Sequence, residues 1–366
     1  MKLTVNRDIL SKSLRRCDLK AAPTGNPALA SVALSARNVP DLPGGLDLRA
    51  TNGLLGVASM VACNTEREGD VFINTKQLAT VVNMMPLGTL TLESRGEDLV
   101  VTSGERRWRG KTLPLTHVKA LPELPETATL KLPAEELARA IDRVRFAVSN
   151  AGAEHTARQG VLLDLLDGAL SSVVIGDHMI AISRGQEKLA GTWRGFLPEI
   201  TLPLAHDIAL EEEKGTIELF CDEHYTWLQN SSTLLVYNPP PGEFIDWRFQ
   251  LSKLKPTPIC RLPRLAVLES LKALIAACPE EFARTWVQVK SDGTLLLDYS
   301  SSSGDIAFHD SITVTDLTET PCPAFIINAE YLRDALDAAG GDAILNHDDY
   351  RHASLTTEDG FLWTCA

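Results

Sequence analysis

The feature that most constrains this sequence is a unit that occurs three times along the chain. In each copy a short apolar strand runs into a helix-initiating residue, and these residues, Asn6, Pro133 and Pro263, are 127 and 130 positions apart. An apolar stripe at helical spacing begins four residues after each of them. Asparagine and proline suit this point, because the first turn of a helix leaves N–H groups unpaired. The repeat predicts three domains built on one plan.

Each copy carries its apolar stripe on the helix face that should pack on a core. The stripes are Leu10, Leu14 and Cys17; Leu137, Ile141, Val144 and Val148; and Val267, Leu271, Leu274 and Cys278. A related half-unit follows, in which a strand ending at Asn74, Pro203 or Asn328 leads into a second helix. Strand-like runs separated by turns come after the helices. We therefore predict an α+β fold of three tandem repeated domains, each with two helices packed on antiparallel sheets.

Two polar, proline-marked stretches, residues 121–126 and 251–258, have the composition of linkers. The predicted domains accordingly cover residues 1–122, 127–250 and 256–366. Repeated units of this kind bury their apolar faces by packing against neighbouring units. Six half-units in an arc would place helices on one surface and sheets on the other.

Composition excludes several classes of protein. A hydrophobic content of 44% with 23% charged residues is that of a soluble globular chain. We find no apolar run near the roughly 20 residues of a membrane span and no signal-peptide pattern, so we expect a cytoplasmic protein. The seven cysteines form no CxxC pair, which predicts reduced thiols and neither a zinc site nor a disulfide framework.

The layout and several local sequences resemble the bacterial sliding clamps, the β subunits of DNA polymerase III. The matching sequences are residues 1–5, 99–104 running into 111–114, 160–163 leading to 175–181, and 242–248. The resemblance covers the whole chain. It implies a head-to-tail homodimer whose six domains close a ring around duplex DNA, with helices lining the hole. It also implies a processivity factor that binds DNA polymerase and clamp-loader subunits through short linear motifs and catalyses no reaction.

The net charge of −13 argues against a basic surface throughout, but cations can still gather on an inner surface. Opposite the core stripes, Lys12 and Arg16 in the first copy correspond to Arg139 and Arg143 in the second. The third copy has Glu269 and Ala273 at these positions, with Lys272 to the side. The residues predicted to face DNA phosphates are Lys12, Arg16, Arg139, Arg143 and Lys272. The basic segment 106–111 is open to two interpretations, a charged edge strand or a further DNA contact.

The resemblance also implies a partner-peptide groove and a subunit joint. The groove positions are Ile175, Asp177, His178 and Ile180 in a loop, Ile245 and Phe249 in a wall, and Leu362 and Thr364 in a floor. Apolar residues there suit a peptide with a leucine or aromatic anchor. His178 is equally interpretable as an ordinary hydrogen-bonded histidine. The joint pairs edge strands of the first and third domains, with Trp108 opposite Ala276 and Ala277.

Three alternatives stay open. The polar segments 222–224 and 347–352 contain histidines and carboxylates that could serve an enzyme or a metal, but solvated turns are the favoured interpretation, and we predict no catalytic residue, metal or cofactor. Asp177, Met179 and the short C-terminus depart from the family pattern, which motivates an accessory or specialised clamp with an altered groove. A monomeric or open form is the third alternative.

Overall fold

The structure of the chain, a computed structural model, describes residues 1–19, 26–38, 44–150, 159–176, 178–212, 215–240, 244–278, 283–318, 324–347 and 353–365. The chain divides into two compact units. Unit 1 consists of Met1–Glu135 and Pro203–Pro239, and unit 2 of Glu136–Leu202 and Pro240–Ala366. The finer division into three domains stays a prediction.

Unit 1 is built on one large sheet. Its strands run in the order β8-β7-β6-β1-β4-β16-β15-β14-β9, with β2, β3 and β5 paired off this path. The strands are β1 Lys2–Asn6, β2 Ser31–Arg37, β3 Gly45–Thr51, β4 Leu55–Arg67, β5 Gly69–Asn74, β6 Thr89–Arg95, β7 Asp98–Ser103, β8 Arg106–Lys111, β9 Leu130–Pro133, β14 Thr216–Cys221, β15 Thr226–Gln229 and β16 Thr233–Tyr237. The antiparallel pairing of β4 with β16 joins the first and second predicted domains in one sheet.

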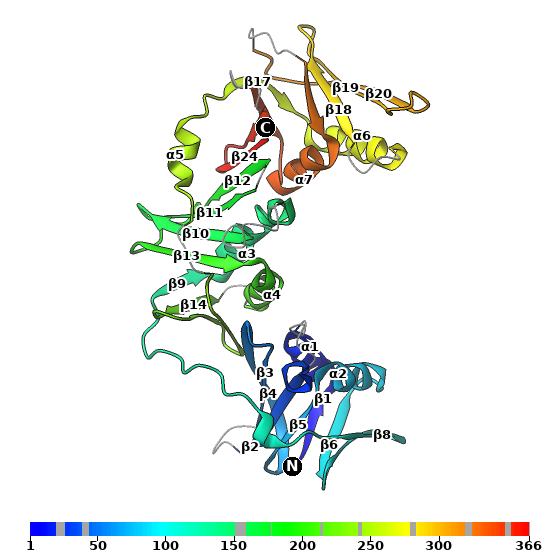
Figure 1. The fold of residues 1–366 in the computed structure, drawn as a ribbon, viewed down its shortest axis with the longest axis vertical. Coiled ribbons are helices and arrows are strands. Elements are labelled where there is room, and N and C mark those ends of the chain that lie inside the picture. Colours follow the sequence, from blue (N-terminus) through cyan, green and yellow to red (C-terminus); the bar gives the residue numbers. More distant parts are fainter. Residues whose placement is uncertain are drawn as a thin grey trace. The chain divides into compact units, whose positions relative to one another are not determined.

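The helices of unit 1 are α1 Arg7–Cys17, α2 Thr75–Met84 and α4 Leu202–Glu211, and α1 lies beside α2 (Figure 1). Asn6 caps α1 by accepting hydrogen bonds from the backbone N–H groups of Asp8 and Ile9, and Asn74 caps α2 in the same way. The predicted stripe of Leu10, Leu14 and Cys17 is buried. Sequence periodicity thus predicted the core face of α1 correctly.

The described residues of unit 2 form two sheets. The larger has the order β13-β10-β11-β12-β24-β23-β22-β17, and the smaller has the order β20-β19-β18-β21. The strands are β10 Gly160–Leu166, β11 Ala169–Ile175, β12 Met179–Arg184, β13 Trp193–Pro198, β17 Thr257–Leu262, β18 Arg284–Val289, β19 Thr294–Ser300, β20 Ala307–Thr313, β21 Phe325–Asn328, β22 Ala343–His347, β23 Ala353–Thr356 and β24 Phe361–Cys365. The helices are α3 Ala134–Asp142, which begins two residues before the unit, α5 Trp247–Ser252, α6 Arg264–Ala277 and α7 Ala329–Ala339.

The helix that follows Pro133 is shorter than its pattern predicts. Its α-helical part, α3, ends at Asp142, and a 3-10 helix continues over Arg145–Asn150. The predicted stripe is nevertheless buried in full, from Leu137 to Val148. The apolar period therefore identified the buried face but not the type of helix beyond Asp142. Within the described part of the chain we find no helix long and apolar enough to cross a membrane.

Candidate functional site

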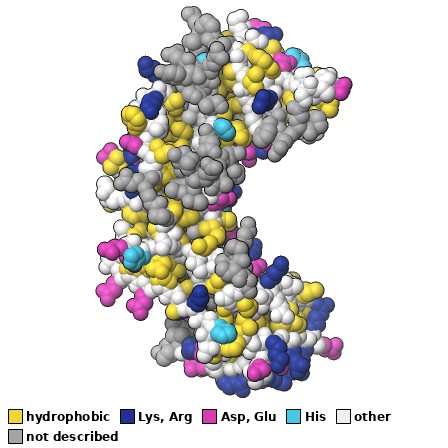
Figure 2. Space-filling view, viewed as in Figure 1, with side chains coloured by type: hydrophobic (Ala, Val, Ile, Leu, Met, Phe, Trp, Pro, Cys, Tyr) yellow, Lys and Arg dark blue, Asp and Glu magenta, His cyan; other side chains and the backbone are white. Residues whose placement is uncertain are grey.

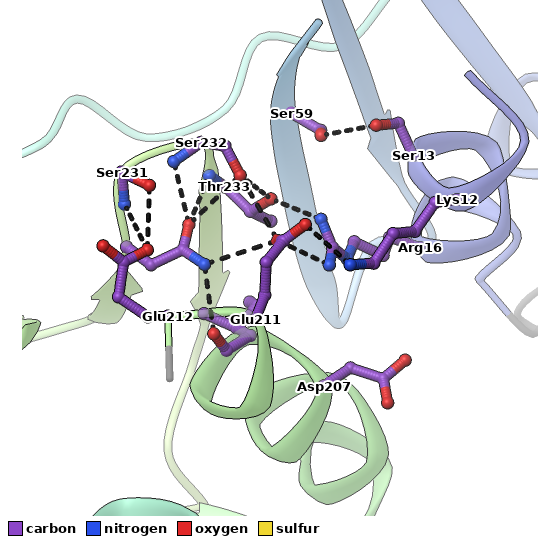
Figure 3. A network of polar contacts seen from close by, with 12 residues as sticks. Lys12, Ser13, Arg16, Ser59, Asp207, Glu211, Glu212, Ser231, Ser232 and Thr233 are labelled. Carbon is purple, nitrogen blue, oxygen red and sulfur yellow. Dashed lines mark hydrogen bonds and ion pairs between the residues drawn. The ribbon is translucent and has the colours of Figure 1, made fainter. Parts of the chain in front are cut away.

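The first candidate site consists of the cations of α1, which lie against the C-terminal end of α4. Lys12 Nζ is 2.9 Å from Glu211 Oε1, and Arg16 Nη2 is 2.6 Å from Glu211 Oε2 (Figure 3). Arg16 Nη1 also donates a hydrogen bond to Thr233 Oγ1 at 3.0 Å. The Arg16 side chain is only 2% exposed. The expectation that Arg16 presents its charge outward is therefore wrong: the guanidinium is buried in an ion pair.

The surroundings of Glu211 explain this arrangement. Asn230 donates a hydrogen bond to the Ile208 carbonyl of α4 and accepts two from the backbone of the turn before β16, at Ser232 and Thr233. The turn and the helix end are thus fixed together around the carboxylate. Burial would raise the pKa of Glu211, but the Lys12 hydrogen bond and the Arg16 charge outweigh it and hold this pKa below its ordinary value.

Arg15, which our sequence analysis did not select, is the more accessible cation of α1. Its side chain is 70% exposed, and its Nη2 lies 3.6 Å from Asp207 Oδ2. A helical projection gives no signal for this difference, because Arg15 and Arg16 lie at similar angles from the stripe of Leu10, Leu14 and Cys17. Lys12 is half-exposed although it pairs with Glu211.

In the second copy the corresponding arginines are also paired. Arg139 Nη2 is 2.9 Å from Glu136 Oε2, one turn away on α3. Arg143 Nη1 donates to Asp359 Oδ1 at 2.8 Å, while its Nη2 contacts Asp359 Oδ2 and donates to the Ala339 carbonyl. With its side chain 13% exposed, Arg143 does not present its charge outward either. The hydrogen bonds from Arg143, helped by one from Thr357, lower the pKa of Asp359.

The third copy differs, as its sequence predicts. Lys272 lies exposed on α6, and so do Glu269 and Ala273. Among the predicted DNA-facing residues, the structure therefore leaves Lys272 exposed and Lys12 half-exposed, whereas the side chains of Arg16 and Arg143 are withdrawn into ion pairs.

The predicted groove residues come together in unit 2. Ile175 belongs to a buried apolar cluster with Leu162, Val173, Ile182 and Trp247. Ile180, Ile245 and Leu362 are partly buried and pack against it. The neighbouring Phe249 of α5 is 57% exposed, with Lys253 Nζ 4.3 Å from its ring centroid.

Of the three remaining groove positions, two lie among the described residues. Thr364 is buried and pairs with Ile180 across the β12–β24 ladder, so its backbone forms part of the sheet beneath this surface. His178 is exposed in the turn before β12. Asp177 lies outside the described residues. The structure thus brings four predicted apolar residues together, and their role in binding stays a prediction.

The predicted joint residues lie on an outermost strand of unit 1 and at the C-terminal end of α6 in unit 2. β8, which carries Trp108, is the outermost strand of its sheet, and the half-buried indole of Trp108 lies over Gly110. Cationic side chains gather over β6 and β8 (Figure 2), where Arg95, Arg109 and Lys111 are more than half exposed. In unit 2, Ala276 and Ala277 are exposed at the end of α6, and β20 is an outermost strand.

The segments considered for an enzyme have structural roles where they are described. Asp222 Oδ1 accepts hydrogen bonds from the backbone N–H groups of His224 and Tyr225, which forms the turn between β14 and β15. These hydrogen bonds lower the pKa of Asp222. His347 ends β22, and the rest of segment 347–352 lies outside the described residues.

Comparison with known proteins supports one family. No protein-family model matches the chain. The β sliding clamp of Streptomyces coelicolor is 30% identical over 156 residues, which is 40% of this chain and 38% of that clamp. The β sliding clamp of Rickettsia felis is 21% identical over 329 residues, 87% of this chain and 85% of its own length.

Solved structures match the whole chain. The DNA polymerase sliding clamp of Bacillus subtilis superimposes with a TM-score of 0.86 at 15% identity, covering 100% of this chain and 98% of that one. The DNA polymerase III β subunit of Thermotoga maritima gives 0.85 at 18% identity, with the same coverage. The fold is therefore the sliding-clamp fold. The chain is a divergent relative of the bacterial β sliding clamps, and the resemblance predicted from its sequence is confirmed.

Proposed function

We propose that this chain is a DNA sliding clamp, a ring-shaped processivity factor that encircles duplex DNA and tethers DNA polymerase and other replication or repair proteins. The observation that carries the proposal is the match of the entire chain to β-subunit structures, together with an alignment to a β sliding clamp over 87% of its length. In this proposal the protein acts in the cytoplasm and works by tethering, without catalysis.

DNA contacts in this proposal are few and independent of sequence. Lys12, Arg15 and Lys272 are the cations best placed to meet phosphates, because their side chains are exposed or half-exposed, whereas those of Arg16 and Arg143 are withdrawn into ion pairs. Such exposed contacts are screened by salt, and each phosphate neutralised adds about 0.9 to the logarithmic salt slope. A ring with these cations would slide on DNA and be held mainly by its closure.

The proposed ring closes through two outermost strands, β8 of one copy and β20 of another. An outermost strand presents unpaired N–H and C=O groups that a second strand can satisfy. Charge supports the pairing, since β8 carries Arg107 and Arg109 while β20 carries Asp310. In the proposed joint Trp108 packs against Ala276 and Ala277 of the other copy.

The proposed partner surface is the apolar cluster that includes Ile175, Ile180, Ile245 and Leu362, with Phe249 exposed beside it. Its side chains favour a peptide whose leucine or aromatic residue inserts as an anchor. DNA polymerase and clamp-loader subunits would present such short motifs. His178, and Asp177 beside it, would contact the peptide at its margin.

Two measurements test the proposal. Light scattering at micromolar concentration should give twice the chain mass of 39.9 kDa, and a mass near one chain would contradict the stable ring. A fluorescently labelled peptide with leucine and phenylalanine anchors should bind with a micromolar Kd. A dimer that does not bind the peptide would favour the accessory clamp with an altered groove, which Asp177, Met179 and the C-terminal sequence motivate.

A further inference from the structure

A buried carboxylate holds the short helix α5 against the larger sheet of unit 2. Asp164 lies on β10, and its side chain is 7% exposed. Its Oδ2 accepts a hydrogen bond from Trp247 Nε1 at 2.9 Å and another from Arg248 Nη1 at 2.6 Å. Both donors are consecutive residues at the start of α5.

The three side chains form one packed group. The Arg248 guanidinium carbon lies 4.3 Å from the centroid of the Trp247 ring, a cation–π distance. The indole itself packs in the apolar cluster with Leu162 and Ile175. Asp164 therefore connects the sheet, through Trp247, to the surface on which partner binding is proposed.

α5 needs such an anchor. A helix of six residues has too few internal hydrogen bonds to be stable alone. Asp246 caps its first turn by accepting from the N–H groups of Arg248 and Phe249. Among the described residues, the side-chain hydrogen bonds that tie α5 to another element are the two to Asp164. A buried carboxylate is costly unless paired, so these bonds account for its presence on an apolar strand.

The two residues on either side of the anchor belong to the proposed partner surface. Ile245 precedes α5 and packs on the cluster, and Phe249 lies in its first turns with 57% of its surface exposed. If α5 opens, both side chains lose their fixed positions. The apparent affinity of a peptide then falls in proportion to the fraction of molecules with α5 docked.

We propose that Asp164 is a positioning residue for partner binding: it fixes α5, and thereby Ile245 and Phe249, in the arrangement that accepts an apolar peptide anchor. This inference rests on the proposed function. Its physical basis is preorganisation, because a wall that is already ordered does not have to be ordered when the peptide binds.

The test compares Asp164→Ala and Asp164→Asn with the wild-type chain in two measurements. Hydrogen exchange of amides 244–252 reports on the docking of α5, and anisotropy of a labelled peptide with leucine and phenylalanine anchors reports on binding. For Asp164→Ala we expect about tenfold faster exchange in this segment and about tenfold weaker binding. Asp164→Asn should lie between, since its amide oxygen still accepts from Trp247 but without a charge for Arg248.

Ser172→Ala is the matched control. Ser172 is fully buried on the neighbouring strand β11 and donates to the Ser183 carbonyl, away from α5. It should change overall stability without changing exchange at 244–252 or peptide affinity. Tryptophan fluorescence gives a further signature, since loss of the Trp247 hydrogen bond should shift the emission in Asp164→Ala but not in Asp164→Asn.

The two measurements keep the inference separate from the proposed function. Unchanged exchange at 244–252 in Asp164→Ala overturns the positioning role. Faster exchange with unchanged peptide affinity overturns its connection to partner binding. A wild-type chain that does not bind the peptide contradicts the proposed partner surface, and the exchange data then decide separately whether Asp164 holds α5.

Discussion

Arg16 and Arg143 occupy the same place in the repeat, and both reach across to a distant hairpin turn. Arg16 donates to Thr233, 217 residues away, and Arg143 to Asp359, 216 residues away. The charge balance of the two sites differs. Glu211 forms ion pairs with both Lys12 and Arg16, whereas among the described residues Asp359 forms an ion pair with Arg143 only.

The arginine at this repeated position is therefore neutralised in two different ways. At the first site a single carboxylate neutralises two cations, one of them buried, so the carboxylate is the sensitive partner. At the second site the pair is balanced, and the Arg143 guanidinium also lies 6.0 Å from the centroid of the Phe361 ring. In the third copy Ala273 has no charge to contribute, and this position is exposed.

The largest effect is expected for Glu211→Gln. It leaves the Arg16 guanidinium buried without a countercharge, which should cost about 3–5 kcal/mol of the free energy of unfolding. Urea unfolding followed by circular dichroism measures the loss. Glu212→Gln is the matched control, because among the described residues the Glu212 carboxylate accepts hydrogen bonds only from Ser231 at the exposed turn. An equal loss in both variants would contradict the central role of Glu211.

A double variant tests whether this loss of stability comes from the unpaired charge of Arg16. Arg16→Met combined with Glu211→Gln should recover most of the lost stability, because a buried apolar side chain replaces the uncompensated charge. Failure to recover would mean that Glu211 acts through Asn230 and Ser232 rather than through Arg16.

Asp359→Asn should have a smaller effect, about 2 kcal/mol, because the Asp359 side chain is 35% exposed and water compensates part of the loss. The same unfolding measurement applies. Asp142→Asn provides the control, since the pair of Asp142 with Arg145 is an exposed helix pair that should contribute about 0.5 kcal/mol or less. The comparison fails if Asp359→Asn destabilises more than Glu211→Gln.

Stability should also depend on pH at both sites. The pKa values of Glu211 and Asp359 lie below their ordinary values of 4.5 and 3.8. Each carboxylate therefore binds its proton more weakly in the folded state, so its stabilisation is present above the ordinary pKa and is lost as pH falls through the folded-state pKa. Melting temperatures measured from pH 6 down to pH 3 should fall by about 2–4 °C less in Glu211→Gln than in wild type. Parallel curves would contradict this linkage.

The smallest effect is expected in the third copy. Ala273→Arg adds the missing arginine at an exposed position of α6, so it should change the free energy of unfolding by about 0.5 kcal/mol or less. Thermal unfolding measures it. A stabilisation above 1 kcal/mol would show that an acidic partner exists for this position as well.

Helical periodicity and capping were enough to predict where α1 begins and which face it buries. Leu10 and Leu14 had to face a core because they recur at the helical period, and Asn6 had to begin the helix because its side chain accepts the first N–H groups. The resemblance to sliding clamps supplied Ile175, Ile180, Ile245 and Leu362, which the structure brings together.

Periodicity could not predict what packs on the opposite face of a helix. The buried stripes and the helix starts could be predicted from the sequence, because they depend on neighbours within one or two turns. The burial of Arg16 against Glu211, the pairing of Arg143 with Asp359 and the hydrogen bond from Trp247 to Asp164 became known only from the three-dimensional structure. Each of these contacts joins segments more than 80 residues apart, so no local pattern encodes the partner.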